Sequence, residues 1–303
     1  MVPTAPNTTG DAVTEQFLDH RRLLFSVVYN MLGSVADTED VLQEVWLAWS
    51  ARLRGQDAGP VGNPRGYLVR IAVNQALARR ADINRRQETY VGPWLPEPLV
   101  AAEDDVVGAA EPGESLSTAV LVVLETLSPL ERAVFVLHEV FGFGHPQIAD
   151  ILGRTPAAVR QLASRARRHV HARRPRHRAA PKVHAQVTER FVAAALGGDL
   201  RALLEVLAPE VTLWTDGGGK GPAAGLRPVH GRDRVAALLV AVASAPSLGR
   251  LDVRHRQAAG GPCAVVFSED GPLAVVMVDL APDSHRITGV YSVTNPDKLT
   301  GIR

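Results

Sequence analysis

The stretch "HPQIADILGRTPAAVRQLASRARRHV" constrains the fold more than any other part of the chain. A helix-turn-helix requires a small residue where its first helix meets the second, a turn residue that tolerates positive φ, and an aliphatic residue on the inner face of the second helix. Ala149, Gly153 and Val159 supply these residues, at separations of four and six. Thr155 is suited to cap the second helix, and Pro156 to occupy its first turn. The stretch is therefore predicted to be a helix-turn-helix.

The second helix of this motif has an apolar and a polar face. The apolar stripe consists of Val159, Leu162, Ala166 and Val170. Polar and basic side chains on the other face are of the types that bind base edges and phosphates. The residues predicted to bind DNA through this motif are Arg154, Thr155, Arg160, Gln161, Ser164, Arg165 and Arg168. Arg173 and Arg174, which follow them, are expected to contact phosphates. Ten basic and no acidic residues between 151 and 188 favour a polyanionic partner, although a solvated basic helix in an ordinary bundle is the alternative.

Length and composition bound the remaining possibilities. A chain of 303 residues exceeds the usual size of one domain, so two or three domains are expected. A single cysteine, Cys263, excludes an intramolecular disulfide and a Cys-rich zinc site, and we expect no metal and no cofactor. The N-terminal residues lack a basic segment followed by an apolar run, and no stretch of about twenty apolar residues occurs. The protein is thus expected to be cytoplasmic and to have no membrane partner.

Residues 13–87 are predicted to form a helical domain. Apolar residues recur at three-to-four spacing until Gly33, where the first helix is expected to end. A second amphipathic run, "SVADTEDVLQEVWLAW", follows, with Asp37 as its expected N-cap. Pro64 is suited to the first turn of a third helix, "RGYLVRIAVNQALARR".

A linker and a second helical domain are expected next. Residues 88–115 hold four prolines and little periodicity, which is typical of a linker. An apolar helix follows, and then Ser128 and Glu131 have the spacing of a capping box at the start of another helix. Together with the helix-turn-helix, these helices are predicted to form a domain over residues 116–174.

Residues 182–303 have the pattern of an α+β domain. Two helices precede a strand at "EVTLW", and a helix near 232–245 precedes several β-rich runs. These runs lie near 250–258, 263–268, 272–280 and 285–293. Helices followed by a run of antiparallel strands favour an α+β fold. The predicted fold class is therefore multidomain, with two all-α domains followed by one α+β domain.

The two helical modules, in this order, resemble a bacterial RNA polymerase sigma factor of the extracytoplasmic-function group (group IV). "DTEDVLQEVWLAW" is similar to the region-2 helix that binds the clamp helices of the largest polymerase subunit. "NPRGYLVRIAVNQALARR" is similar to the helix that engages the −10 element, and residues 116–174 resemble region 4, which reads the −35 element. The resemblance implies core RNA polymerase and promoter DNA as partners, and a role in transcription initiation rather than enzymatic activity.

The resemblance also assigns residues to these partners. The residues assigned to core polymerase are Asp37, Asp40, Gln43 and Glu44. Three of them are acids at helical spacing, which suits a basic partner surface, although an ordinary exposed acidic face is the alternative. The residues assigned to the −10 element are Arg70, Asn74, Gln75, Arg79 and Arg80. The helix-turn-helix residues are assigned to the −35 element, and the loop at 52–64 is suited to receive a flipped base.

The C-terminal part resembles the SnoaL-like cone-shaped fold of polyketide cyclases and ketosteroid isomerases. Three short stretches, "YVGPWLPEPL", "DGGGK" and "NPDKL", resemble one sigma subgroup that carries this extension. The resemblance implies that the domain modulates the activity of the sigma factor. The regulatory residues implied are Asp216, Gly217, Gly218, Gly219, Lys220, Asn295, Pro296, Asp297, Lys298 and Leu299. We call Asp216 to Lys220 the glycine loop. It is not a phosphate-binding loop of the common kind, because Gly221 and Pro222 follow its lysine. The alternative to a regulatory role is a plain surface turn.

Because a cone-shaped fold encloses a pocket, a small-molecule ligand is a further candidate partner. A cyclase or isomerase needs an Asp or His base beside an apolar cavity, and no spacing singles out a pair among Asp216, His230, His255 and Asp279. The aromatic candidates, for a cavity or for plain core, are Trp214, Phe267 and Tyr291. The alternative function is a one-component helix-turn-helix regulator whose C-terminal domain senses a small molecule.

Overall fold

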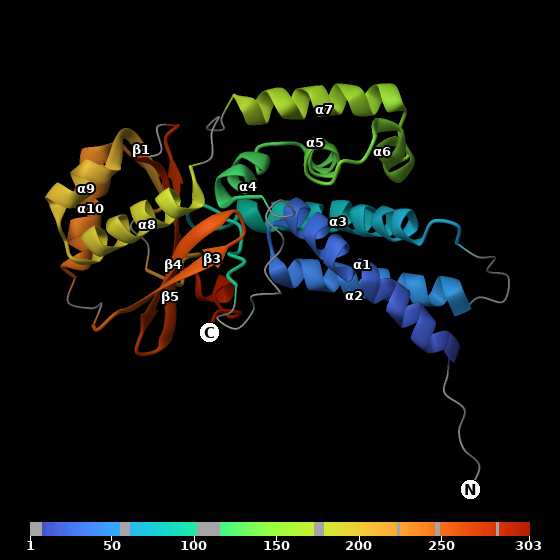
Figure 1. Cartoon of the computed structure of the whole chain (residues 1–303), viewed down its shortest axis with the longest axis horizontal. Helices are drawn as coiled ribbons and strands as arrows, with labels where there is room; N and C mark the ends of the chain where they lie inside the picture. Colours follow the sequence, from blue (N-terminus) through green and yellow to red (C-terminus); the bar gives the residue numbers. More distant parts are fainter. Residues whose placement is uncertain are drawn as a thin grey trace, which may run out of the picture. The chain divides into compact units, whose positions relative to one another are not determined.

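The computed structural model describes residues 8–54, 61–101, 116–172, 179–222, 225–245, 249–282 and 285–303 (Figure 1). The chain divides into two compact units. The first comprises Met1–Arg85 and Leu127–Arg167, and the second comprises Arg86–Thr126 and Arg168–Arg303. This division differs from the predicted segments, since the linker and the start of the predicted second helical domain group with the C-terminal domain.

Three long helices open the first unit: α1 (Thr8–Leu32), α2 (Val35–Arg54) and α3 (Pro64–Glu88). The first helix ends as predicted, and the Gly33 N–H donates to the Tyr29 carbonyl at 2.7 Å. The prediction that Asp37 caps α2 is wrong. Ser34 precedes the helix, and its hydroxyl accepts a hydrogen bond from the Asp37 N–H at 3.3 Å, so Asp37 lies in the first turn.

Four shorter elements complete this unit: α5 (Pro129–Phe135), the π-helix η1 (Val136–Val140), α6 (His145–Leu152) and α7 (Pro156–His171). The predicted capping box is confirmed. The Ser128 side chain accepts from the Glu131 N–H, and the Glu131 side chain accepts from the Ser128 N–H at 3.2 Å. The π-helix was not expected from the sequence, because its five residues continue the apolar run of α5.

The C-terminal half of α1 is buried, and two arginines bind its last carbonyl groups. Arg80 of α3 donates to the Leu32 carbonyl at 3.3 Å, and Arg132 of α5, which is 2% exposed, donates to the Asn30 carbonyl at 3.0 Å. The last carbonyls of a helix carry a partial negative charge, so a cation there is stabilising. Helix α5 is therefore tied to α1 within this unit.

The second unit is built on a six-stranded sheet with strand order β2-β1-β6-β5-β4-β3. The strands are β1 (Leu207–Asp216), β2 (Val229–His230), β3 (Asp252–Ala258), β4 (Gly261–Ser268), β5 (Gly271–Leu280) and β6 (Ile287–Val293). Strands β3 to β6 form the predicted antiparallel run. Strand β1 pairs in parallel with β6, which was not predicted from the sequence. No hairpin joins the two, because α10 and the four strands β2 to β5 separate them in the chain.

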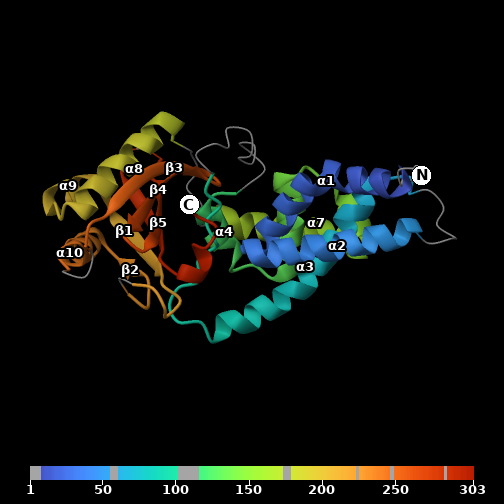
Figure 2. The ribbon, with the colours of Figure 1, turned by 90° about the horizontal axis from the view of Figure 1, so that it is seen from below.

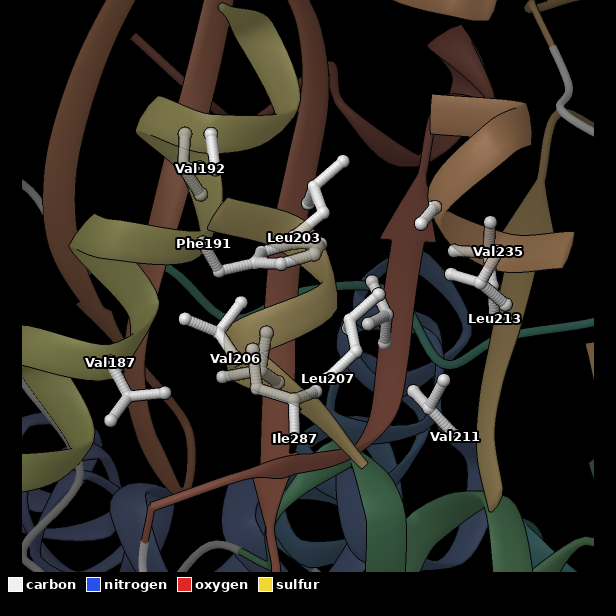
Figure 3. Close-up of a cluster of buried hydrophobic side chains, with 14 of the residues drawn as sticks. Val187, Phe191, Val192, Leu203, Val206, Leu207, Val211, Leu213, Val235 and Ile287 are labelled. Atoms are coloured by element: carbon white, nitrogen blue, oxygen red, sulfur yellow. The ribbon is translucent and has the colours of Figure 1, made fainter. Parts of the chain in front are cut away.

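Three helices cover one face of this sheet: α8 (Pro181–Leu196), α9 (Leu200–Val206) and α10 (Arg232–Ala243) (Figures 1 and 2). Figure 3 shows the core between these helices and the sheet, in which Phe191 of α8 and Leu203 of α9 pack with strand residues such as Val211. These side chains are almost fully buried, and such burial contributes most of the stability of a fold of this kind.

The opposite face of the sheet is covered by the predicted linker, by α4 (Thr118–Leu124) and by residues at the C-terminal end of the chain. The apolar side chains that cover it are Leu95, Val100, Ala119, Val122, Leu299 and Ile302. At the sheet edge, the Ala101 N–H donates to the Gln257 carbonyl at 2.8 Å, and the Ala259 N–H donates to the Leu99 carbonyl at 2.9 Å. The linker thus extends the sheet beyond β3, as a peptide does in β-augmentation.

Candidate functional site

The three predicted regulatory stretches meet around Asp216, the last residue of β1, which is 0% exposed. Its Oδ1 accepts a hydrogen bond from the Tyr90 hydroxyl, and its Oδ2 accepts from the Leu95 N–H and from Lys298 Nζ, each at 2.8 Å. Its backbone carbonyl accepts from the N–H groups of residues 294 and 295. One buried carboxylate therefore joins the linker, the glycine loop and the C-terminal stretch.

Lys298 is the cation of this site and ends the short helix η3 (Pro296–Lys298). Besides its ion pair with Asp216, Nζ donates to the Leu95 carbonyl at 2.6 Å and lies 3.7 Å from the centre of the Trp94 ring. Burial lowers the pKa of Lys298, and the Asp216 carboxylate opposes that shift. A buried ammonium group requires such partners, because desolvation of an unpaired charge is very unfavourable. We call Tyr90, Leu95, Asp216 and Lys298 the linker lock.

Asn295 and Tyr90 extend the linker lock. Asn295 Nδ2 donates to the Tyr90 hydroxyl oxygen at 2.7 Å, while Asn295 Oδ1 accepts from the Asp297 N–H at 3.0 Å. The Tyr90 ring packs edge-on against Trp94, with the ring centres 4.6 Å apart. Burial, and then the hydrogen bond to Asp216, raise the pKa of the Tyr90 hydroxyl, so it remains a neutral donor at physiological pH.

The glycine loop approaches its neighbours more closely than any other residue type would allow. A Cβ on Gly218, whose φ is +60°, would lie 2.4 Å from Asn295 Nδ2, and a Cβ on Gly221 would lie 2.0 Å from the Thr294 carbonyl oxygen. Gly217 turns the loop, since its carbonyl accepts from the N–H groups of the residues three and four positions later. Lys220 forms an exposed ion pair with Asp297 at 2.5 Å.

The remaining residues that were predicted to be regulatory lie at the same place. Pro296 is exposed in the first turn of η3, and Leu299 is buried among the side chains that cover the sheet. Gly219 approaches Val91 of the linker, where an added Cβ would lie 3.2 Å from the Val91 Cβ. The structure thus brings together the linker, the glycine loop and the C-terminal stretch, which were predicted to be regulatory.

The aromatic residues considered for a ligand cavity lie instead on the face covered by the linker. Trp214 and Tyr291 stack with ring centres 4.9 Å apart and pack with Phe267 in that cluster. Among the titratable candidates, His230 hydrogen-bonds with Thr212 at 3.0 Å and lines a cavity of about 380 Å³, whereas His255 lines another of about 230 Å³. Asp279 is half-buried. In the part of the chain that the structure describes, no three His, Cys, Asp or Glu side chains are grouped as a metal site would require.

The residues assigned to core polymerase separate into a buried and an exposed group. Asp40, Gln43 and Glu44 are exposed along α2, as a partner surface requires. Asp37 is buried and pairs with Arg79, so its assignment as a surface contact is corrected. Leu47, which is 60% exposed and follows Gln43 and Glu44 at helical spacing, adds an apolar side chain to this face that the charge pattern did not reveal.

The residues assigned to the −10 element are also divided by the fold. Arg70 and Asn74 are exposed on α3, and Gln75 is half-buried. The assignment of Arg80 is corrected, because its side chain is buried and binds the end of α1. Arg79 is paired with two carboxylates of α2. The described part of the predicted base-accepting loop ends at Arg54 and resumes at Val61, and residues 55–60 lie outside the described residues.

The helix-turn-helix has the predicted local geometry. Gly153 lies in the left-handed region, with φ 60° and ψ 43°, and the Thr155 hydroxyl accepts from the Ala158 N–H at 3.2 Å. The predicted stripe of Val159, Leu162, Ala166 and Val170 is buried, together with Ala163. The residues assigned to the −35 element are all exposed: Arg154, Thr155, Arg160, Gln161, Ser164, Arg165 and Arg168. Arg173 and Arg174 lie outside the described residues.

Two arginines of α7 form ion pairs that the sequence did not predict. Arg165 Nε lies 3.1 Å from Glu131, and Arg167 Nη2 lies 2.6 Å from Glu139. Both acids precede the helix-turn-helix in the chain, so only the folded arrangement of α5, η1 and α7 brings them to the recognition helix. These contacts hold two cationic side chains close to the exposed face of α7.

Comparisons with known proteins agree with this arrangement. Residues 17–86 match the family model "Sigma-70 region 2", and residues 117–170 match "Sigma-70, region 4". The chain is 33% identical to the ECF RNA polymerase sigma factor SigJ of Mycobacterium tuberculosis, over 93% of this chain and 91% of that protein. It is 31% identical to the probable ECF RNA polymerase sigma factor SigI of the same species, over 97% of both chains.

The solved structures give the same result for the fold. The crystal structure of the M. tuberculosis extracytoplasmic-function sigma factor SigJ superposes with a TM-score of 0.73, covering 95% of this chain and 98% of that one. Among the described residues, no helix combines the length and the apolar character needed to cross a membrane. The matched regions occur in the predicted order, and the similarity extends through the C-terminal domain. The chain therefore belongs to the extracytoplasmic-function sigma factors of RNA polymerase, which are transcription initiation factors rather than enzymes.

Proposed function

We propose that the C-terminal domain of this sigma factor regulates promoter recognition by holding the linker between region 2 and region 4. The observation that carries this proposal is the linker lock, in which buried Asp216 binds Tyr90 and Leu95 of the linker and Lys298 of the C-terminal stretch. The linker also covers an apolar face of the sheet, so we assign that face to the linker rather than to a small-molecule ligand. We infer that the protein acts in the cytoplasm, on core polymerase and promoter DNA.

The physical basis of this regulation is the separation of two DNA-reading modules. Region 2 reads the −10 element and region 4 reads the −35 element. The length of linker that is free to move therefore determines the distances between the two elements that the two regions can span together. A domain that binds the linker favours one set of geometries over another. Two such states need to differ by only about a few kcal/mol to act as a switch.

The experiment that tests this proposal compares two lysine substitutions in the full-length protein. Lys298→Met removes the cation of the linker lock, whereas the control Lys220→Met removes an exposed ion pair nearby. Run-off transcription with core polymerase, on promoters of different −35 to −10 spacing, should change in its spacing preference for Lys298→Met only. Identical profiles for both variants and the wild type would mean that the domain does not regulate promoter choice.

The exposed face of α2 that includes Asp40, Gln43 and Glu44 is proposed to bind core polymerase. Asp40→Asn combined with Glu44→Gln is expected to weaken core-polymerase binding at least about tenfold, since a close charge pair at an interface contributes about 1.5 kcal/mol or more. Exposed helix charges contribute little to folding, so the unfolding temperature should change little. Fluorescence anisotropy with labelled protein, at low and at moderate salt, measures the affinity.

Glu39→Gln is the matched control for this substitution. Glu39 is an exposed acid of the same helix, but it pairs with Arg21 of α1. Its replacement should leave polymerase affinity within about twofold of wild type, as expected for a peripheral charge. If the double variant binds polymerase as tightly as the Glu39→Gln variant, the proposed face is not the contact.

The exposed face of α7 is proposed to read the −35 element. Arg160→Ala or Arg165→Ala should reduce transcription in a way that depends on the −35 sequence, because a base contact discriminates by about 1–3 kcal/mol. Arg173→Ala should weaken binding to all promoters alike and lower the salt dependence by about one unit, as the loss of one phosphate contact does. Promoter binding by the holoenzyme, measured across single-base −35 variants and salt concentrations, separates the two classes. Equal effects of all three substitutions on every promoter would contradict this division.

A further inference from the structure

Arg79 lies between the two surfaces that region 2 is proposed to present to its partners. It belongs to α3, which carries the residues assigned to the −10 element by the resemblance, yet its guanidinium reaches α2, the helix proposed to bind polymerase. Nε pairs with Asp37 at 2.8 Å, and Nη2 pairs with Asp40. The Asp37 carboxylate is buried, whereas the Asp40 side chain is 57% exposed. A single arginine thus joins a buried acid to an exposed one.

This geometry leaves the guanidinium of Arg79 with little freedom to contact DNA. The hydrogen bond to Asp37, and then the charges of Asp37, Asp40 and Glu44, raise the pKa of Arg79. Moving the guanidinium to a base or phosphate would break its hydrogen bond and ion pair with the buried Asp37 carboxylate, which is unfavourable. The planar guanidinium can bind two carboxylates at fixed directions, which a lysine ammonium cannot reproduce.

We propose that Arg79 is a positioning residue for the polymerase interface, which holds the exposed carboxylate of Asp40 in place, rather than a −10 DNA contact. Asp40 Oδ2 accepts from Arg79, and a carboxylate has lone pairs enough to accept from a basic group of polymerase as well. Fixing the side chain before binding reduces the conformational entropy lost when the interface forms. The inference rests on the proposed polymerase face and deepens it.

The test is a double-mutant cycle on core-polymerase affinity, with the full-length protein. Arg79→Lys keeps a positive charge near Asp37 but removes the second arm that reaches Asp40. It is expected to weaken polymerase binding about three- to tenfold in the wild-type background, and to have no further effect in the Asp40→Asn background, as expected for two coupled residues. In the Glu44→Gln background, which leaves the Arg79–Asp40 pair intact, the loss should persist in full.

Two further measurements separate positioning from DNA contact and from general destabilisation. Binding of the preassembled holoenzyme to single-stranded −10 DNA should be unchanged by Arg79→Lys. The substitution should also shift the thermal unfolding midpoint by the same amount in the wild-type background as in the Asp40→Asn background. Losses of polymerase affinity that simply add, an affinity that rises on Arg79→Lys, or a loss confined to −10 DNA would each overturn the inference. If Asp40→Asn and Glu44→Gln themselves leave polymerase affinity unchanged, the proposed polymerase face fails instead.

Discussion

An Asp216→Ala variant is expected to lose about 3–5 kcal/mol of unfolding free energy in the second unit, because the Lys298 ammonium would stay buried without its carboxylate. The same substitution removes the acceptor of the Tyr90 hydroxyl and of the Leu95 N–H. Urea unfolding followed by tryptophan fluorescence measures the change, and Trp94, which lies against Lys298, reports directly on the linker lock.

Two controls distinguish a buried charge from an ordinary lost contact. Lys220→Ala breaks an exposed ion pair between the same two stretches of chain and should cost less than about 1 kcal/mol. Asp216→Leu combined with Lys298→Met removes both charges and should be less destabilising than Asp216→Ala alone, since replacing a buried pair by apolar groups relieves the desolvation cost. If Asp216→Ala costs no more than Lys220→Ala, the linker lock does not stabilise this unit.

Local signals in the sequence were sufficient to predict most helix ends and the helix-turn-helix. The capping box at Ser128, the cap at Thr155 and the left-handed turn at Gly153 each depend on residues only a few positions apart. Such interactions form within one turn, so their spacing in the chain determines their geometry. The exposed and buried faces of α7 followed from the same periodicity.

The features that the sequence did not predict depend on contacts between distant segments. The parallel pairing of β1 with β6 depends on the path of the chain through the sheet. The burial of Arg80 and Arg132 depends on their meeting the end of α1, which no local pattern encodes. The resemblance placed Asp216 in a regulatory loop, but its hydrogen bond to Tyr90 joins residues 126 positions apart and required the folded structure.

Gly221→Ala is expected to release the linker without removing any charge or hydrogen-bonding group. The added Cβ would lie 2.0 Å from the Thr294 carbonyl oxygen. The main chain fixes the position of a Cβ, and the oxygen is itself a main-chain atom, so no side-chain rotation can relieve the overlap. The loop must then move away from residues 294 and 295, whose N–H groups bind the Asp216 carbonyl. Overpacking of this kind costs about 1–3 kcal/mol, which corresponds to up to about a hundredfold loss of hydrogen-exchange protection at the Leu95 amide.

The Leu95 amide is the decisive probe because its N–H donates to the Asp216 carboxylate at 2.8 Å and lies in the linker rather than in the loop that is changed. Gly301→Ala is the matched control, since an added Cβ there has no neighbour within 4 Å and should leave the exchange rate unchanged. If Gly221→Ala releases the linker, amides of the core strand β5 should keep their protection while that of Leu95 falls. Equal protection of Leu95 in both variants would mean that the loop can shift without disturbing Asp216, and that the close approach at Gly221 does not maintain the linker lock.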